Sequence, residues 1–305
     1  MICKNCVLPI STGKDFCENC EKLVSDPHYK EYFSKRTIFK KDFEDFLGKT
    51  KRIVFAYSGG LDSTVVLHKL NLKCKEKGIE LSCFTLDHGF KGNFVKNNIQ
   101  RVIEFEGLKK NHVWVDISGE KALDGNSVKN YFTLLSVNGI IPCGKKCNTI
   151  IDFAYKKILD SFGEKILFTG GDTPAWSSSL NRYSIFWEKP LFTVLRGGIA
   201  FGLNKKMNAE LIKKENIPWQ NPDCGGCDTD CLLPGAVLRV LQQKGFDVGV
   251  IFSNLDAARD YFYERVRWKI IDREIALNEL KIPPLSGKIS FSEFKDITGY
   301  CGRNL

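Results

Sequence analysis

Two glycines flanked by hydroxyl and carboxylate side chains follow an apolar run. The segment reads Tyr57-Ser58-Gly59-Gly60-Leu61-Asp62-Ser63-Thr64 and comes directly after Ile53-Val54-Phe55-Ala56. A strand that turns through glycines into a helix directs backbone N–H groups and a helix N-terminus at one point, which suits a phosphate. Ser58 and Ser63 add hydroxyl donors, and Asp62 either holds Mg²⁺ or positions the loop. The segment therefore predicts a phosphate-binding loop, although a plain capped turn has the same local pattern.

Four cysteines form two C-x-x-C pairs at the N-terminus. Cys3 and Cys6 make the first pair, and Cys17 and Cys20 make the second after an interval of ten residues. This spacing is typical of a tetrahedral zinc site with four cysteine ligands. Because four protein ligands leave zinc no open position, the expected role is structural. The surrounding segment is too short to bury a core and is expected to fold around the metal.

Five further cysteines form two later groups. Cys143 and Cys147 precede a predicted helix, and Cys224, Cys227 and Cys231 follow about 80 residues later. Each group is incomplete as a tetrahedral site unless the two combine. Cytoplasmic thiols are kept reduced, so paired cysteines in such a protein indicate metal binding or thiol chemistry rather than disulfide bonds.

The elements that must position these residues follow an alternating pattern from residue 51 onward. Short apolar runs separated by amphipathic segments indicate a parallel sheet covered by helices. The expected strands are residues 53–57, 81–86, 112–115 and 165–169, and the expected intervening helices are 62–77, 93–106 and 148–162. The pattern weakens over residues 170–204, and helices are expected again at 205–215, 235–244, 254–267 and 272–280. The predicted fold is α/β, with a doubly wound, mostly parallel sheet.

Composition and charge restrict the compartment and the partners. No apolar run approaches the roughly 20 residues that a membrane span needs, and the N-terminus lacks the apolar region of a secretory signal, so we expect a cytoplasmic protein with no membrane contact. The excess of 45 Lys and Arg over 36 Asp and Glu gives a net charge of +9, which favours a polyanion such as tRNA or a phosphorylated small molecule, although lysines spread over the whole surface give the same net charge. A homodimer is expected because two-fold symmetric oligomers are common.

The S-G-G-x-D-S segment in its strand-to-helix setting resembles the loop of the PP-loop ATP pyrophosphatases. The resemblance implies that the loop binds ATP, that a substrate oxygen attacks the α-phosphate and that pyrophosphate leaves. It also implies that Thr85, Leu86 and Asp87, which end the second strand, line the adenosine pocket. By the same resemblance Gly170, Gly171 and Asp172 complete the ATP site. Many tRNA-modifying relatives have T-G-H-x-x-D-D at this last position, where this chain has T-G-G-D.

The residue pattern along the chain also predicts its division into regions. The predicted regions are a zinc knuckle at 1–22, a helical linker at 23–50, a PP-loop ATP-binding domain at 51–204 and a helical C-terminal region at 205–305. The segment Arg265-Val266-Arg267 falls in the last of these and is assigned a structural role alone.

The later cysteines resemble the arrangement in the PP-loop sulfurtransferases that thiolate tRNA. In those enzymes a cysteine pair before the equivalent helix and a cysteine after an I-P segment hold an iron-sulfur cluster beside ATP, and Ile217-Pro218 here precedes Cys224. The resemblance implies a 4Fe-4S cluster on Cys143, Cys147 and one of Cys224, Cys227 or Cys231. An iron with three protein thiolates keeps a position open for sulfide. A second zinc site and a cysteine persulfide relay are the alternatives.

Three functions remain open from the sequence. The first is an ATP-dependent sulfurtransferase that adenylates a carbonyl oxygen of a tRNA or a small molecule and takes sulfur from a desulfurase, sulfide or a carrier. The second is an ammonia-dependent amidotransferase with a glutaminase partner, because the N-terminal cysteine segment also resembles that of N-acetyl sugar amidotransferases. The third is a non-catalytic nucleotide-binding or zinc interaction module.

Overall fold

The computed structural model describes residues 1–88, 91, 93–119, 145–220 and 255–281. Its central feature is a six-stranded sheet with the order β3-β2-β1-β4-β8-β7. The parallel strands are β1 (Arg52–Ala56), β2 (Glu80–Asp87), β3 (His112–Asp116), β4 (Ile166–Thr169) and β8 (Thr193–Arg196). The edge strand β7 (Phe186–Glu188) runs antiparallel to β8. The predicted α/β fold with a mostly parallel sheet is confirmed.

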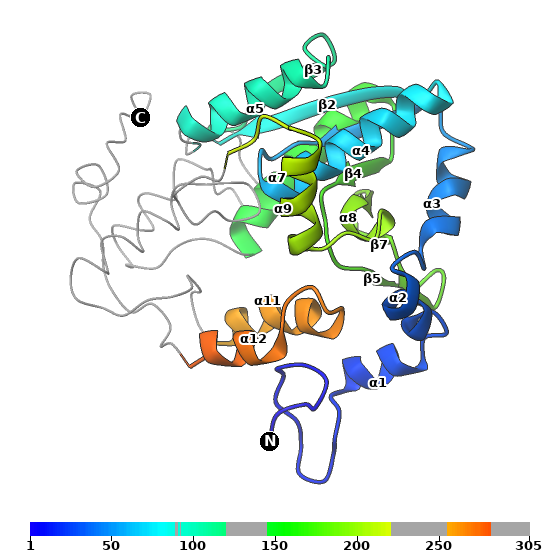
Figure 1. Ribbon diagram of the computed structural model, residues 1–305, viewed down its shortest axis with the longest axis vertical. Helices are drawn as coiled ribbons and strands as arrows, with labels where there is room; N and C mark the ends of the chain where they lie inside the picture. The colour runs from blue at the N-terminus through cyan, green and yellow to red at the C-terminus, as the bar shows by residue number, and fades with distance from the viewer. Residues whose placement is uncertain (89–90, 92, 120–144, 221–254, 282–305) are drawn as a thin grey trace, which may run out of the picture.

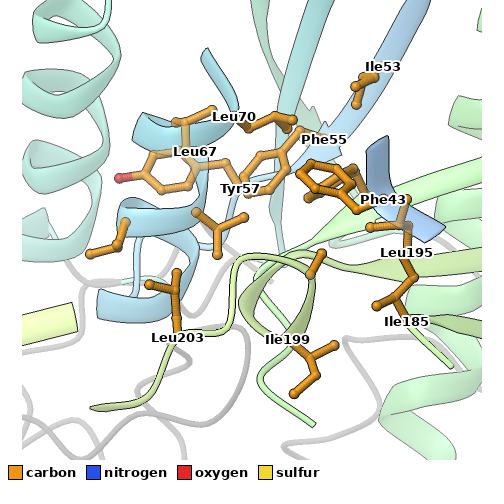
Figure 2. Packing of buried hydrophobic residues seen from close by; sticks show 14 of the residues in the cluster. Phe43, Ile53, Phe55, Tyr57, Leu67, Leu70, Ile185, Leu195, Ile199 and Leu203 are labelled. Carbon is orange, nitrogen blue, oxygen red and sulfur yellow. The ribbon is translucent and has the colours of Figure 1, made fainter. Parts of the chain in front are cut away.

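Side chains of β1 alternate between two buried faces of the sheet. Phe55 and Tyr57 belong to the larger apolar core, which also contains Leu67, Leu195 and Ile199 from neighbouring elements. Figure 2 shows this packing between the sheet and the helices on that face. Val54 and Ala56 belong instead to a second core. A strand buried on both faces reads as an unbroken apolar run, as residues 53–57 do.

Helices cover both faces of the sheet (Figure 1). The first core includes side chains from α4 (Leu61–Lys77), α5 (Asn93–Phe105), α8 (Gly197–Ala200) and α9 (Lys205–Lys214), whereas α7 (Lys145–Phe162) packs on the second. Asn204 caps α9 by accepting a hydrogen bond from the backbone N–H of Met207 at 2.9 Å. Among the described helices, none combines the length and the apolar composition needed to cross a membrane.

The stretch from residue 170 to 204 contains structure that the sequence pattern did not reveal. It forms the two-stranded antiparallel hairpin of β5 (Ala175–Ser177) and β6 (Arg182–Ser184), followed by β7, β8 and α8. Strands of three or four residues are too short to show a clear periodicity. The helix expected at 235–244 lies outside the described residues.

The two ends of the described chain pack together. The N-terminal part forms a cysteine-rich loop, α1 (Glu18–Ser25), α2 (Tyr29–Lys35) and α3 (Lys40–Leu47), and the C-terminal part forms α11 (Leu255–Arg267) and α12 (Arg273–Glu279). Trp268, directly after α11, is fully buried, and its ring lies 5.0 Å from Tyr32 and 5.3 Å from Tyr183, measured between ring centroids. Aromatic packing therefore joins both ends of the chain to the β5–β6 hairpin.

Candidate functional site

The candidate site lies where the order of the strands reverses. Strands β2 and β3 extend the sheet on one side of β1, and β4, β8 and β7 extend it on the other. Ligands of doubly wound sheets bind beyond the carboxyl ends of the strands at such a point. The loops after β1 and β4 meet here. A Cβ atom on Gly170 would lie 2.7 Å from Cα and 2.8 Å from the backbone nitrogen of Ser63, so glycine is required for this approach.

The loop after β1 has the geometry of a phosphate cradle. Gly59 has a φ of +93°, and a Cβ there would lie 2.6 Å from Ile99. The backbone N–H of Gly60 donates to Oγ of Ser58 at 3.2 Å, and the Ser63 hydroxyl donates to the Gly60 carbonyl at 3.0 Å. Gly60 then caps α4 in an extended conformation. Both predicted serines lie within the turn that opens α4, and their hydroxyl oxygens are 2.9 Å apart.

Two carboxylates and a lysine adjoin this cradle. Asp62 accepts a hydrogen bond from Lys205 and another, of 2.7 Å, from the Asn208 side chain. Lys205 also lies 3.9 Å from Oδ2 of Asp172, and Arg265 lies 3.7 Å from the same oxygen. Asp172 is 7% exposed, so these charges interact where water screens them poorly. The loops after β1 and β4 are thus tied together electrostatically through α9 and α11.

A small, open recess lies beside the cradle. Ser58 and Lys91 contribute polar groups to its wall. The rest of the wall is apolar or aromatic and consists of Ala56, Tyr57, Phe84, Leu86 and Tyr155. Strands β1 and β2 and helix α7 contribute these residues. An apolar recess with few polar groups is the usual character of a nucleoside site.

Several other residues predicted to bind the nucleotide are buried or paired with neighbouring side chains. Thr85 is buried and donates to the Tyr57 carbonyl at 2.9 Å. Thr64 is also buried, with its hydroxyl 3.0 Å from that of Tyr57. Asp87, at the end of β2, pairs with Lys96 of α5 at 2.8 Å. Thr85 therefore holds the backbone beside the pocket and Thr64 holds the Tyr57 side chain, whereas Leu86 lines the pocket.

Four residues at the cradle were not identified from the sequence. Lys91 is 5% exposed and donates to the Ser58 carbonyl at 3.0 Å. Trp219 donates its indole N–H to the Gly59 carbonyl at 2.8 Å. Lys205 and Asn208 hold Asp62, as described above. Lys91 follows the end of β2 so closely that the sequence could have suggested it, but the other three reach the loop only through the tertiary fold.

The four N-terminal thiols converge on one point. The sulfur atoms of Cys3, Cys6, Cys17 and Cys20 all lie within 4.8 Å of one another, and those of Cys6 and Cys17 are 3.7 Å apart. Sulfurs at about 2.3 Å from one tetrahedral zinc would be about 3.8 Å apart. The backbone N–H of Leu8 donates to the Cys6 sulfur and that of Cys17 to the Cys3 sulfur, both at 3.4 Å. The donor set therefore fits a tetrahedral metal with stabilised thiolates.

The acidity of these thiols is consistent with metal binding. The pKa of Cys6 is lowered to about 6, chiefly because the Cys20 thiol donates a hydrogen bond to it. The same bond raises the pKa of Cys20, and burial raises the pKa of Cys17 to about 11. One thiolate is therefore available near neutral pH, and a metal must displace protons from the others.

Of the later cysteines, the described residues include Cys147 alone. It lies in the first turn of α7. Helix α7 leads into the parallel strand β4, so its first turn lies toward the carboxyl edge of the sheet, where the cradle also lies. Cys143, Cys224, Cys227 and Cys231 lie outside the described residues.

The glycine cradle at the reversal point of a parallel sheet has the geometry expected of a phosphate-binding site. A sequence model of the family described as "PP-loop domain" matches residues 33–127. The matched residues include the phosphate cradle and strands β1, β2 and β3.

Two known proteins are similar over most of the chain. An uncharacterized protein from Methanocaldococcus jannaschii is 24% identical over 284 residues, which cover 91% of this chain and 89% of that protein. A solved structure of the U34-tRNA thiolase from Methanococcus maripaludis, with its 4Fe-4S cluster, shares 16% identity at a TM-score of 0.46. That similarity covers 95% of this chain and 91% of the thiolase.

Proposed function

We propose that this protein is an ATP-dependent sulfurtransferase. A carbonyl oxygen of the acceptor attacks the α-phosphate of Mg-ATP, pyrophosphate leaves, and sulfur then displaces AMP from the activated carbon. The observation that carries the proposal is the phosphate cradle beside Asp62 and Asp172, with the first turn of α7, which contains Cys147, on the same edge of the sheet. Adenylation makes a poor leaving group into a good one, which is what a thiol nucleophile requires.

The residues around the cradle can divide the work of binding and activation. The apolar pocket of Phe84, Leu86 and Tyr155 suits the adenosine, while the backbone N–H groups of the loop and the Ser58 and Ser63 hydroxyls face the phosphates. Asp62 and Asp172 are suited to hold Mg²⁺, since that ion binds through one or two carboxylates together with substrate phosphates. Lys91 and Lys205 supply positive charge for the departing pyrophosphate.

The sulfur chemistry is assigned to the later cysteines. Cys143 and Cys147, with one of Cys224, Cys227 or Cys231, would hold a 4Fe-4S cluster, whose open position supplies a sulfide nucleophile. A persulfide on the same thiols is the alternative source. A sulfur donor such as a desulfurase, sulfide or a carrier must replenish either form. Cytoplasm is the compartment that keeps such thiols reduced.

The acceptor to test first is tRNA. The net charge of +9 favours a polyanion, and binding through phosphates should weaken steeply as salt increases. The affinity for a small-molecule acceptor would depend on salt only weakly, because such a molecule carries few charges.

Anaerobic purification tests the sulfur assignment. We expect about four iron and four acid-labile sulfides per chain, and Cys143→Ser and Cys147→Ser should stop thiolation while pyrophosphate release stays near that of the wild type. Cys83→Ser is the matched control, because Cys83 is a buried strand residue whose pKa is raised to about 12 by burial. Protein without iron or sulfide that forms an amide when ammonia is supplied would contradict sulfur transfer and favour the amidotransferase reaction with a glutaminase partner.

A separate measurement tests the N-terminal metal. We expect about one zinc per chain, and Cys6→Ser should remove it and destabilise the N-terminal loop, since metal binding supplies the folding energy of such a short segment. Cys74→Ser, which alters a buried thiol of α4, should retain the zinc. Zinc content that is the same in Cys6→Ser and the wild type would exclude this site.

A further inference from the structure

The four-cysteine loop is docked on the two C-terminal helices. Arg273 of α12 donates to the carbonyl of Cys3 at 3.1 Å and to that of Cys6 at 3.2 Å. Val7, which directly follows Cys6, is 1% exposed and packs with Phe262 and Val266 of α11. Figure 1 shows α11 and α12 between the N-terminal loop and the sheet. The four-cysteine loop is therefore in direct contact with both helices.

Helix α11 reaches the nucleotide site on its other side. Its residue Arg265 lies 3.7 Å from Oδ2 of Asp172, in the loop after β4. Both side chains are largely buried, at 17% and 9% exposure. The same oxygen lies 3.9 Å from Lys205, which holds Asp62 of the phosphate cradle. A continuous series of contacts thus runs from the Cys3 and Cys6 backbone to the loop that binds phosphate.

The end of α11 is packed too tightly to shift independently. Arg267 is 1% exposed, pairs with Glu264 and lies over the Tyr263 ring at 4.5 Å. Tyr263 also packs against the four-cysteine cluster. Trp268 follows within the aromatic cluster described above. Closely packed side chains transmit a displacement because few voids are available to absorb it.

We propose that the metal at the four-cysteine site anchors α11 so that Arg265 positions Asp172 in the nucleotide site, and that metal occupancy thereby sets the affinity for ATP. Arg265 acts as a positioning residue. Without Arg265, the Asp172 carboxylate keeps Lys205 as its described cation but loses the contact that holds it in the orientation suited to the Mg²⁺ of Mg-ATP. The inference rests on ATP binding, which is part of the proposed function, and does not depend on which nucleophile follows.

The first test compares ATP affinities of full-length variants by calorimetry, with Mg-ATP as the ligand. We expect Arg265→Met to weaken binding about tenfold, at the lower end of typical coupling between sites, and Arg265→Lys to recover most of the loss. Cys17→Ser, which removes the metal, should weaken binding by a similar factor. Arg52→Met is the matched control, because it removes an exposed ion pair with Glu80 at the amino end of β1. It should bind ATP as the wild type does.

A second variant keeps the metal while uncoupling the helices. Arg273→Met leaves all four thiols in place, so we expect full metal content, faster hydrogen exchange across residues 255–281 and weaker ATP binding. Exchange in α4 should not change. This variant remains informative if Cys17→Ser does not fold.

The combination of variants decides the mechanism. In Arg265→Met, adding Cys17→Ser or Arg273→Met should cause little further loss of ATP affinity. The first substitution has already removed the contact between Arg265 and Asp172 that connects the metal site to the nucleotide site. Fully additive losses, or ATP affinity that is independent of metal content, would overturn the inference. Failure of the wild-type protein to bind ATP at all would instead overturn the proposed function.

Discussion

Pyrophosphate release falls by about 10²- to 10³-fold when Asp62 is replaced by asparagine. The change preserves the shape of the side chain and removes the charge that Lys205 neutralises. It also removes a carboxylate suited to Mg²⁺ beside the phosphates. Loss of one electrostatic contact at a reacting centre has an effect of this size. Steady-state pyrophosphate release with saturating Mg-ATP and acceptor measures it.

Glu76→Gln is the control for the Asp62 variant. Glu76 lies near the other end of α4, is exposed and pairs with Lys73 at 2.9 Å, so its replacement should leave the rate unchanged. The melting temperature of Asp62→Asn should stay within a few degrees of the wild type, because the carboxylate is partly exposed. A wild-type rate in Asp62→Asn would show that the loop is an ordinary strand-to-helix turn.

Gly170→Ala is expected to separate the two loops of the site. The new Cβ would lie 2.7 Å from the Ser63 Cα, which is backbone and cannot move aside as a flexible side chain could. Overpacking of this kind costs about 1 to 3 kcal/mol of unfolding free energy. Displacement of reacting groups by about 1 Å costs about 10²-fold in rate. Chemical denaturation and pyrophosphate release measure the two effects separately.

Gly48→Ala provides the comparison for Gly170→Ala. Gly48 has an ordinary φ of −69°, and a Cβ there would lie 3.4 Å from the nearest atom, the Glu44 carbonyl oxygen. Alanine at such a position is neutral or slightly stabilising. If Gly170→Ala were as stable and as active as Gly48→Ala, the close contact between the loops after β1 and β4 would not exist in solution.

The repeating part of the fold was predictable because its signals are local. Apolar runs and amphipathic periodicity located the first four parallel strands, and the observed bounds of β1 and α4, Arg52–Ala56 and Leu61–Lys77, differ from the expected ones by one residue. Gly59 marked the loop because its φ of +93° is a conformation that favours glycine. The two C-x-x-C pairs likewise predicted the convergence of four thiols that the structure contains.

The remaining parts depend on contacts between distant residues. Strands β5 to β8 contain three or four residues each and are fixed by pairing, so no periodicity indicated them. Asn208 lies 146 residues after Asp62 in sequence, although its side chain lies 2.7 Å from the carboxylate. Arg265 was assigned a structural role from the sequence, and the structure places it 3.7 Å from Asp172. Single-sequence patterns carry no information about such distances.

The docking of Arg273 on the backbone of Cys3 and Cys6 joins residues 270 and 267 positions apart. The four cysteines precede α12 in the chain, so at roughly 5 to 20 residues per second α12 leaves the ribosome tens of seconds after them. The cysteines can therefore capture metal long before the surface that covers Val7 exists. We therefore expect the yield of folded protein to depend on whether metal is supplied during translation or only after it.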